Sequence, residues 1–302
     1  MKDMLFLELF FSGLTRGSIY ALLALGYTMV YGIVQLINFA HGEIYMIGAF
    51  TALIVTSILT FTGMPVGAIL VLAAFVAVVY SSAYGFTMEK IAYKPLRQAP
   101  RLSALISAIG MSLFLQNYVL LAQTSDFLPF RTLIPEFKFL QSFESIIRSS
   151  QFVIFVTTAA VMVALTFLIK FSKIGKSMRA TSQDKVMAML SGININRVIS
   201  VTFIIGSATA AIGGVLISSH IGQINFYIGF IAGIKAFVAA VLGGIGSIPG
   251  AVLGSFVLGL TESYATGYIS SDYEDVFAFL FLILILIFKP SGLLGRSTRQ
   301  KV

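Results

Sequence analysis

Cysteine is absent from all 302 positions, so the chain can have no disulfide, no thiol chemistry and no cysteine-based metal site. Charged side chains are also scarce. They make up 11% of the residues, against roughly a quarter in an average soluble domain. The hydrophobic fraction is 58% and the mean hydropathy is +0.95. This composition excludes an ordinary soluble domain and indicates a protein that lies largely within a membrane.

Motifs that would carry catalysis or nucleotide binding are missing as well. No Ser/His/Asp arrangement, metal-ligand cluster or repeated carboxylate pair stands out, so an enzyme, a metal and a cofactor are not expected. Gly175, Lys176 and Ser177 look like the end of a phosphate-binding loop, but Lys170 stands where its first glycine is required. The chain therefore carries no nucleotide site of this type.

Long apolar runs dominate what is present. Several approach or exceed the roughly 18–20 residues that cross a bilayer as a helix. We therefore predict an all-α, polytopic membrane protein with interrupted helices and a single transmembrane domain, residues 1–302. Residues 1–11 are expected to form a short interfacial segment before the first span. Breaks between the runs predict about nine spans (eight to ten), near residues 13–36, 44–61, 65–88, 102–123, 152–169, 198–218, 226–242, 249–268 and 276–288.

The distribution of positive charge predicts the orientation. The formal net charge is +8, but fourteen of the twenty Lys and Arg lie in residues 90–101, 170–197 and 289–301, which argues against a nucleic-acid surface. The positive-inside rule places these segments in the cytoplasm. Residues 124–150, with balanced charges, and 270–275, with three acids, then lie outside. The N-terminus is predicted outside, without a cleaved signal, and the C-terminus inside. As labelling positions, Arg97, Lys176 and Arg299 are expected inside, and Ser142 and Ser270 outside.

Residues 170–197 form the longest polar interruption on the basic side. No proline or glycine occurs from Met178 to Leu190, and apolar residues recur at helical spacing, so we predict one short amphipathic helix that ends near Gly192. Its apolar face could dock on a partner. Two alternatives stay open at this point: the helix lies on lipid headgroups, or its basic residues only set the topology.

Polar residues inside the apolar runs are the other functional candidates. Asn38, His41 and Glu43 mark a helix start, where Asn38 can cap and Glu43 favours the positive end of the helix dipole. Such an end can face an anionic group of a passing solute, or the three can form a satisfied cap. Lys235 lies near the centre of a span, with Glu262 and Glu43 as candidate partners. An intramembrane cation marks either a transport pathway or a structural ion pair.

Glycines recur at four-residue spacing near the last spans. Gly229 and Gly233, Gly246 and Gly250, and Gly250 and Gly254 are spaced as small-xxx-small pairs, which predict close helix packing rather than chemistry. Gln116 and Asn117 are expected to form interhelical hydrogen bonds.

Five segments resemble one family. The chain is similar to branched-chain amino acid ABC importer permeases of the LivH type across almost its whole length, least in residues 124–150. The segments that carry the resemblance are GSIYALLALGYTMVYGIVQLINFAHGEIYMIGAF, EKIAYKPLR, LISAIGMSLFLQNY, GININRVISVTF and AFVAAVLGGIGSIPGA.

The resemblance implies a permease subunit in a bacterial inner membrane that imports Leu, Ile and Val at the expense of ATP. Its expected partners are a second, LivM-like permease, two cytoplasmic ATPases and an external solute-binding protein. Residues 170–197 resemble the cytoplasmic coupling loop, and the docking candidates are Arg179, Asp184, Val186, Met189, Leu190 and Gly192. Two alternatives remain: a related permease for urea or short amides, and an autonomous secondary transporter.

Overall fold

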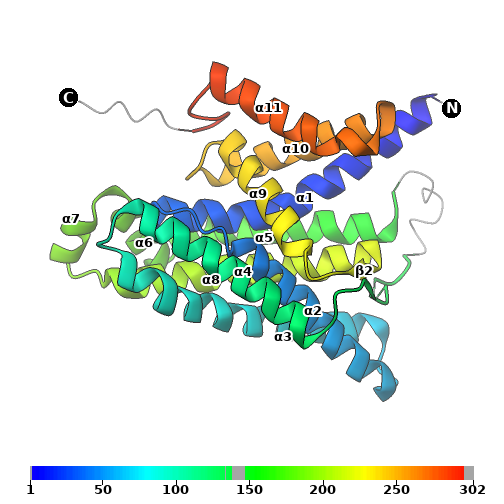
Figure 1. Ribbon diagram of the computed structural model, residues 1–302, viewed down its shortest axis with the longest axis horizontal. Coiled ribbons are helices and arrows are strands. Elements are labelled where there is room, and N and C mark those ends of the chain that lie inside the picture. The colour runs from blue at the N-terminus through cyan, green and yellow to red at the C-terminus, as the bar shows by residue number, and fades with distance from the viewer. Residues whose placement is uncertain (1, 133, 138–146, 296–302) are drawn as a thin grey trace.

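The computed structural model describes residues 2–132, 134–137 and 147–295, and most of these lie in helices (Figure 1). The helices before the basic loop of residues 170–197 are α1 (Lys2–Val34), α2 (His41–Leu59), α3 (Val66–Met88), α4 (Arg101–Ala122) and α5 (Ser149–Phe171). Those that follow are α6 (Lys173–Gln183), α7 (Lys185–Leu190), α8 (Ile195–Ile221), α9 (Ile228–Gly243), α10 (Ile248–Tyr268) and α11 (Glu274–Phe288). The predicted all-α class is confirmed.

Short elements join the helices. The π-helical turn η2 (Glu89–Tyr93) follows α3, and the 3-10 turns are η1 (Thr60–Thr62), η3 (Lys94–Leu96) and η5 (Ser271–Tyr273). Two short strands, β1 (Leu128–Pro129) and β2 (Gln223–Ile224), pair antiparallel with Leu128 opposite Ile224. This pair joins residues before α5 to the end of α8. Ser142 and Arg299, which were named as labelling positions, lie outside the described residues.

Among the described residues, fewer helices meet the length and hydropathy of a membrane span than the nine that the sequence predicts. Six helices in the described part of the chain are long and apolar enough to cross, namely α1, α2, α3, α4, α5 and α8. Helices α9 and α10 are bent by 119° at their junction and add a seventh span if they are taken together. At about 1.5 Å per residue, the 15 residues of α11 reach roughly 22 Å, less than the roughly 30 Å hydrocarbon core. Helices occur where all nine spans were expected, but nine crossings are not confirmed.

Helix α1 forms the centre of the molecule. It packs against α10, α8, α9 and α5, and its most apolar stretch is almost wholly buried (Figure 1). The backbones of α1 and α10 approach closely because glycines meet there: a Cβ added to Gly259 would lie 2.4 Å from the backbone nitrogen of Gly17. By contrast, the apolar stretches of α3 and α5 are mostly exposed, as suits helices that face lipid.

The expectation of a separate interfacial segment at residues 1–11 is wrong. Helix α1 runs without interruption from Lys2 to Val34. The physical reason is that no glycine or proline stands before Gly13, so nothing stops the helix there. Gly13 itself lies within α1, where its missing side chain allows the backbone of Leu260 to approach.

The predicted close packing of glycines is found at two of the three pairs. Gly229 and Gly233 pack against Gly42, and the pair at positions 250 and 254 packs against the end of α9. Gly246 is different: it has a φ of +94° and no atom within 4 Å of an added Cβ. It serves the turn between α9 and α10 instead, because its left-handed backbone favours glycine.

The predicted single helix from 178 to 190 is two helices. The chain breaks at Asp184, whose φ of −150° is extended and whose carboxylate accepts hydrogen bonds from the backbone nitrogens of Val186 (2.8 Å) and Met187 (3.0 Å). Asp184 therefore ends α6 and caps α7. The predicted stop near Gly192 is confirmed, since Gly192 follows α7 with a φ of +81°.

Candidate functional site

Helix α7 presents the most exposed apolar surface of the loop formed by residues 170–197. Four side chains on this short helix are more than half exposed, namely Val186, Met187, Met189 and Leu190. Ala188 is buried and faces the protein. In Figure 1, α7 lies at the opposite end of the molecule from β2. The structure thus places an apolar, uncovered helix at one tip.

Basic residues anchor this loop to the membrane helices. The guanidinium of Arg179 donates to the carbonyls of Ile169 and Lys170, which are among the last residues of α5. The ammonium of Lys185 donates to the carbonyl of Val34, the last residue of α1, at 3.3 Å. Partial burial, and then the positive charge of Arg97, lower the pKa of Lys185. Arg179 therefore ties α6 to the end of α5, and Lys185 ties the first residue of α7 to the end of α1.

The break between α1 and α2 differs from the predicted cap. Asn38 does not cap α2: the N-cap residue is Ala40, and the Oδ1 atom of Asn38 accepts a hydrogen bond from the hydroxyl of Tyr93 at 2.7 Å. Ala40, whose backbone is in the αR region, occupies the N-cap position of α2. The Asn38 side chain therefore does not cap this helix and instead bonds to Tyr93 in η2. Asn38 is buried, and this bond ties the break to the segment that follows α3.

His41 and Glu43 lie in the first turn of α2, as the sequence indicates, and both are buried. The ring of His41 packs edge-on against Tyr27, with 4.8 Å between centroids, and its Nε2 atom has no hydrogen-bond partner in the described residues. The Oε1 atom of Glu43 accepts from Ser112 (2.9 Å) and Gln116 (3.0 Å) on α4. The interhelical hydrogen bond predicted for Gln116 is confirmed. The one predicted for Asn117 is not found among the described residues, since its amide donates to the carbonyl of Leu113 one turn earlier in α4.

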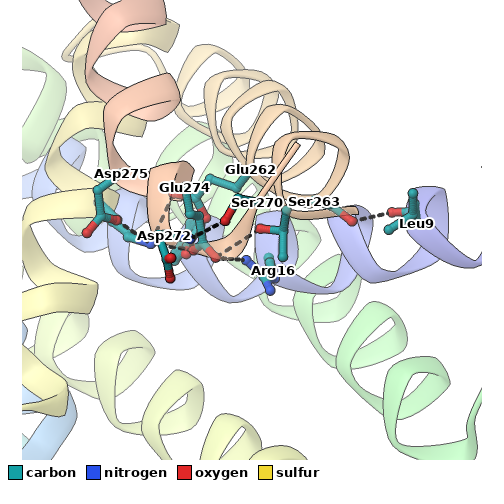
Figure 2. Close-up of polar contacts among 11 residues, drawn as sticks. Leu9, Arg16, Glu262, Ser263, Ser270, Asp272, Glu274 and Asp275 are labelled. Atoms are coloured by element: carbon teal, nitrogen blue, oxygen red, sulfur yellow. Dashed lines mark hydrogen bonds and ion pairs between the residues drawn. The ribbon is translucent and has the colours of Figure 1, made fainter. Parts of the chain in front are cut away.

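Lys235 lies in a network of charges that joins four helices. Figure 2 shows Arg16, Glu262, Glu274 and Asp275 of this network close together. Its Nζ atom is 3.3 Å from Oε1 of Glu262, 2.6 Å from Oε1 of Glu274 and 2.9 Å from Oδ1 of Asp275. Arg16 on α1 joins from the other side, with Nη1 2.7 Å from Oε2 of Glu274. Of the two partners expected for Lys235, Glu262 is found in contact, whereas Glu43 bonds to α4 instead.

The three carboxylates of this network converge closely enough to hold a metal ion. The ammonium of Lys235 lies within 3.3 Å of an oxygen of each, and so it already supplies the positive charge. Glu262 is wholly buried and also accepts a hydrogen bond from Tyr20 at 2.7 Å. A buried carboxylate is stable only with such partners. The arrangement favours a structural cluster of ion pairs over a metal centre.

A cavity of about 550 Å³ opens beside this network. It is lined by α1, α8, α9, the strand β2 and the first residue of α11. Arg16, Lys235 and Glu274 contribute charged groups to the wall, and His220 and Asn225 contribute polar ones. We call it the outer cavity, since it lies on the side of the molecule with β2.

A second buried ion pair lies near the opposite tip. The carboxylate of Glu89 is wholly buried, pairs with Nη2 of Arg97 and accepts from Ser200 at 2.8 Å. Arg97 also donates to Asn196 on α8. These contacts fix the basic segment after α3 to the beginning of α8.

Sequence reasoning did not single out Arg16, Glu89 or Glu274. Arg16 could have been found, because it is a lone cation within the first apolar run, and such a residue needs a partner. Glu274 could not have been found in this way, because it lies with Asp272 and Asp275 in a short acidic segment that the sequence predicts to be an exposed outer loop. Only the fold brings it to Lys235.

Known proteins resemble the chain over most of its length. Residues 9–286 match the family model described as branched-chain amino acid transport system / permease component. The chain is 50% identical over 301 residues to the high-affinity branched-chain amino acid transport system permease protein LivH of Escherichia coli K12, which covers 98% of each chain. The identity and coverage are the same for the corresponding protein BraD of Pseudomonas aeruginosa. The xylose transport system permease protein XylH of E. coli is 34% identical over 98 residues, 30% of this chain and 25% of the relative.

These matches and the apolar helices agree on a multi-pass membrane permease whose task is transport and not catalysis. The family model covers well over half of the chain, and two relatives match it almost from end to end. The chain belongs to the family of permease components of branched-chain amino acid transport systems.

Proposed function

We propose that the chain is the membrane-spanning subunit of an ATP-driven importer that carries leucine, isoleucine and valine across a bacterial inner membrane. The observation that carries this proposal is the 50% identity over 98% of both chains to permeases whose names state branched-chain amino acid transport. The similarity to a xylose permease covers only 30% of the chain and supports a sugar cargo far less.

Purified complex in proteoliposomes tests the cargo. ATP is enclosed in the proteoliposomes, and the cognate binding protein is added outside. Labelled leucine, isoleucine and valine should then accumulate inside, and each unlabelled branched-chain amino acid should compete. Urea and acetamide should neither accumulate nor compete. Accumulation of urea or acetamide in place of leucine would instead support the alternative cargo.

Exposed helix α7 supports an ATPase partner. Its four exposed apolar side chains would be unfavourable in water, and they lie on a loop whose basic residues favour the cytoplasmic side. In this proposal Val186, Met189 and Leu190 contact the ATPase, while Arg179, Asp184 and Gly192 hold the shape of the loop. An autonomous secondary transporter would have no need of this uncovered surface.

Replacement of Val186 and Met189 by Asp tests the docking. Both side chains are exposed, at 61% and 59%, so the permease should fold normally while the apolar contact is lost. The ATPase should no longer co-purify. Ser182→Asp is the matched control, since it adds a charge at an exposed position on the preceding helix. Undiminished co-purification with the double variant would refute docking through α7.

The remaining partners are those expected if the chain is a subunit of an ATP-driven importer. A second permease of the LivM type would complete the pore, two ATPases would bind the pair, and an external binding protein would deliver the cargo. The N-terminus of α1 then lies outside and the C-terminal tail inside.

The transport pathway is proposed to pass the two groups of buried polar residues. Asn38, His41 and Glu43 lie at the break between α1 and α2, where the helical hydrogen bonding is interrupted. Lys235 lines the outer cavity and is paired with Glu262. Irregular backbone and intramembrane charges are tolerated where protein or water surrounds them, and this supports a route between the two groups.

A further inference from the structure

The wall of the outer cavity combines charged and aliphatic side chains. Its volume of about 550 Å³ lies within the range of roughly 300–1,000 Å³ that is usual for small-molecule pockets. The charged network lies at one side. Isoleucines from α1, α8, β2 and α9 form most of the apolar wall, namely Ile19, Ile217, Ile221, Ile224, Ile228 and Ile231.

Of the two cations at this wall, Arg16 has spare hydrogen-bonding capacity. A guanidinium has five N–H donors, and in the described part of the chain only Nη1 of Arg16 has a partner, the Oε2 atom of Glu274. The Arg16 side chain is 34% exposed. Lys235 is only 12% exposed, and its three donors face three carboxylates. A further carboxylate would therefore meet Arg16 and not Lys235.

The balance of charges distinguishes between classes of ligand. The network contains two cations, Arg16 and Lys235, and three carboxylates, Glu262, Glu274 and Asp275. A simple anion would add to the excess negative charge. A zwitterion carries both charges. Its carboxylate can pair with the guanidinium of Arg16, and its ammonium can pair with a carboxylate of the network.

We propose that the outer cavity is a receiving site for a zwitterionic α-amino acid with an aliphatic side chain. Arg16 binds the α-carboxylate through its unoccupied N–H groups, the α-ammonium faces Glu274, and the isoleucines contact the side chain. This inference rests on the proposed function, because that function supplies the cargo. It assigns recognition of the carboxylate to Arg16 on α1 and not to Lys235 on α9.

Cysteine labelling in the assembled transporter tests occupancy directly. Ser12 lies one turn before Arg16 and lines the same cavity, and the native chain has no cysteine. In a complex whose other subunits have been freed of cysteine, the maleimide reaction rate of Ser12→Cys then reports on this site. Leucine should slow the reaction. Leucinamide, which lacks the carboxylate, and 4-methylpentanoate, which lacks the ammonium, should not do so at the same concentration. Ser270→Cys, which lies outside the lining of the cavity, is the control and should react at one rate throughout.

Variants of Arg16 identify the recognising group. In the Ser12→Cys complex, Arg16→Gln should raise the leucine concentration for half-protection by roughly ten- to hundredfold, the usual effect of losing a charged hydrogen bond. Arg16→Lys keeps a cation near Glu274 but loses the planar fork of N–H donors. Its leucine concentration for half-protection should therefore fall between those of the parent and of Arg16→Gln. If Arg16→Gln does not assemble, the Arg16→Lys complex decides the question, provided that its melting temperature equals that of the parent.

Two results would overturn the inference while the proposed function stands: a complex that transports leucine shows no protection at Ser12→Cys, or both Arg16 variants keep the parental half-protection. Failure of the unmodified complex to take up any branched-chain amino acid would refute the proposed function, and the inference with it. Uptake and labelling are measured separately, so these failures are distinguishable.

Discussion

The Nζ atom of Lys235 on α9 lies 2.6 Å from the Oε1 atom of Glu274, the first residue of α11. Arg16 reaches the other oxygen of the same carboxylate from α1 at 2.7 Å (Figure 2). Glu274 therefore joins the central helix α1 and the bent pair of α9 and α10 to a final helix of 15 residues. The beginning of this last helix is thus held in place by ion pairs.

Removal of the lysine should destabilise this assembly. Lys235→Met would leave Glu262 buried without its cation, and loss of one partner of a buried pair typically costs about 3–5 kcal/mol. We expect a clear fall in the melting temperature of the purified permease. Lys176→Met, at an exposed position on α6, is the control and should melt like the parent.

A compensating change should restore most of the loss. In Lys235→Met combined with Glu262→Gln, the buried carboxylate is neutral, Glu274 keeps Arg16, and Asp275 is 64% exposed and can be solvated. The double variant should therefore melt closer to the parent than Lys235→Met does. If the double variant is no more stable than the single one, Glu262 is not the residue that makes Lys235 necessary.

The ion pair of Glu89 and Arg97 should matter for the opposite tip. Arg97→Ala would leave the wholly buried carboxylate of Glu89 with Ser200 as its remaining hydrogen-bond donor among the described residues, at a cost of about 3–5 kcal/mol. Thermal melting of the permease measures this loss. Arg97→Ala with Glu89→Gln should recover much of the stability, and an unchanged melting temperature in Arg97→Ala would contradict the role assigned to the pair.

The sequence predicted those features that depend on neighbours along the chain. The helices, the basic loop, the stop at Gly192 and the packing of Gly229 follow from hydrophobic runs and from glycine chemistry. The break at Asp184 was missed because its carboxylate competes with the helix for backbone donors, which periodicity does not reveal. The contact between Lys235 and Glu274 was missed because it depends on how α11 returns to α9. The bend of 119° between α9 and α10 was not predicted either, because the angle between two helices depends on how they pack against the rest of the fold.

Close packing between α2 and α9 should be intolerant of a single methyl group. A Cβ added to Gly42 would lie 2.2 Å from the carbonyl oxygen of Gly229 and 2.8 Å from the Cα atom of Gly233. Gly42→Ala must therefore push two backbones apart, and we expect a loss of about 1–3 kcal/mol, seen as a lower melting temperature. Gly110→Ala in α4 is the matched control, because no atom lies within 4 Å of its added Cβ. Equal melting temperatures for the two variants would contradict this packing.

The orientation of the chain can be measured with single cysteines. Lys176→Cys should react only with reagent on the cytoplasmic side, and Ser270→Cys only from outside, because the basic loop and the acidic turn are expected on opposite faces. The native chain has no background cysteine. Labelling of both positions from the same side would overturn the proposed orientation.

The cap at Asp184 should control how well α7 docks. Helix α7 has only six residues, too few to form a stable helix alone, so it depends on its cap and on the anchoring of its ends. Asp184→Ala removes the acceptor for the backbone nitrogens of Val186 and Met187, at a cost of about 1 kcal/mol. Amide hydrogen exchange in residues 185–190 should then quicken by roughly fivefold, and binding of the ATPase should weaken by a similar factor.

Asp184→Asn separates the cap from the charge. Asparagine caps helices about as well as aspartate, so exchange in α7 should stay near the parental rate although the negative charge is gone. If ATPase binding also stays near the parental value in Asp184→Asn, the geometry of α7 is what the ATPase recognises. If Asp184→Asn loses binding while its exchange is unchanged, the carboxylate itself contacts the ATPase and the capping role does not explain docking. Ser191→Ala removes an exposed hydrogen bond at the other end of α7 and should leave both measurements close to the parent.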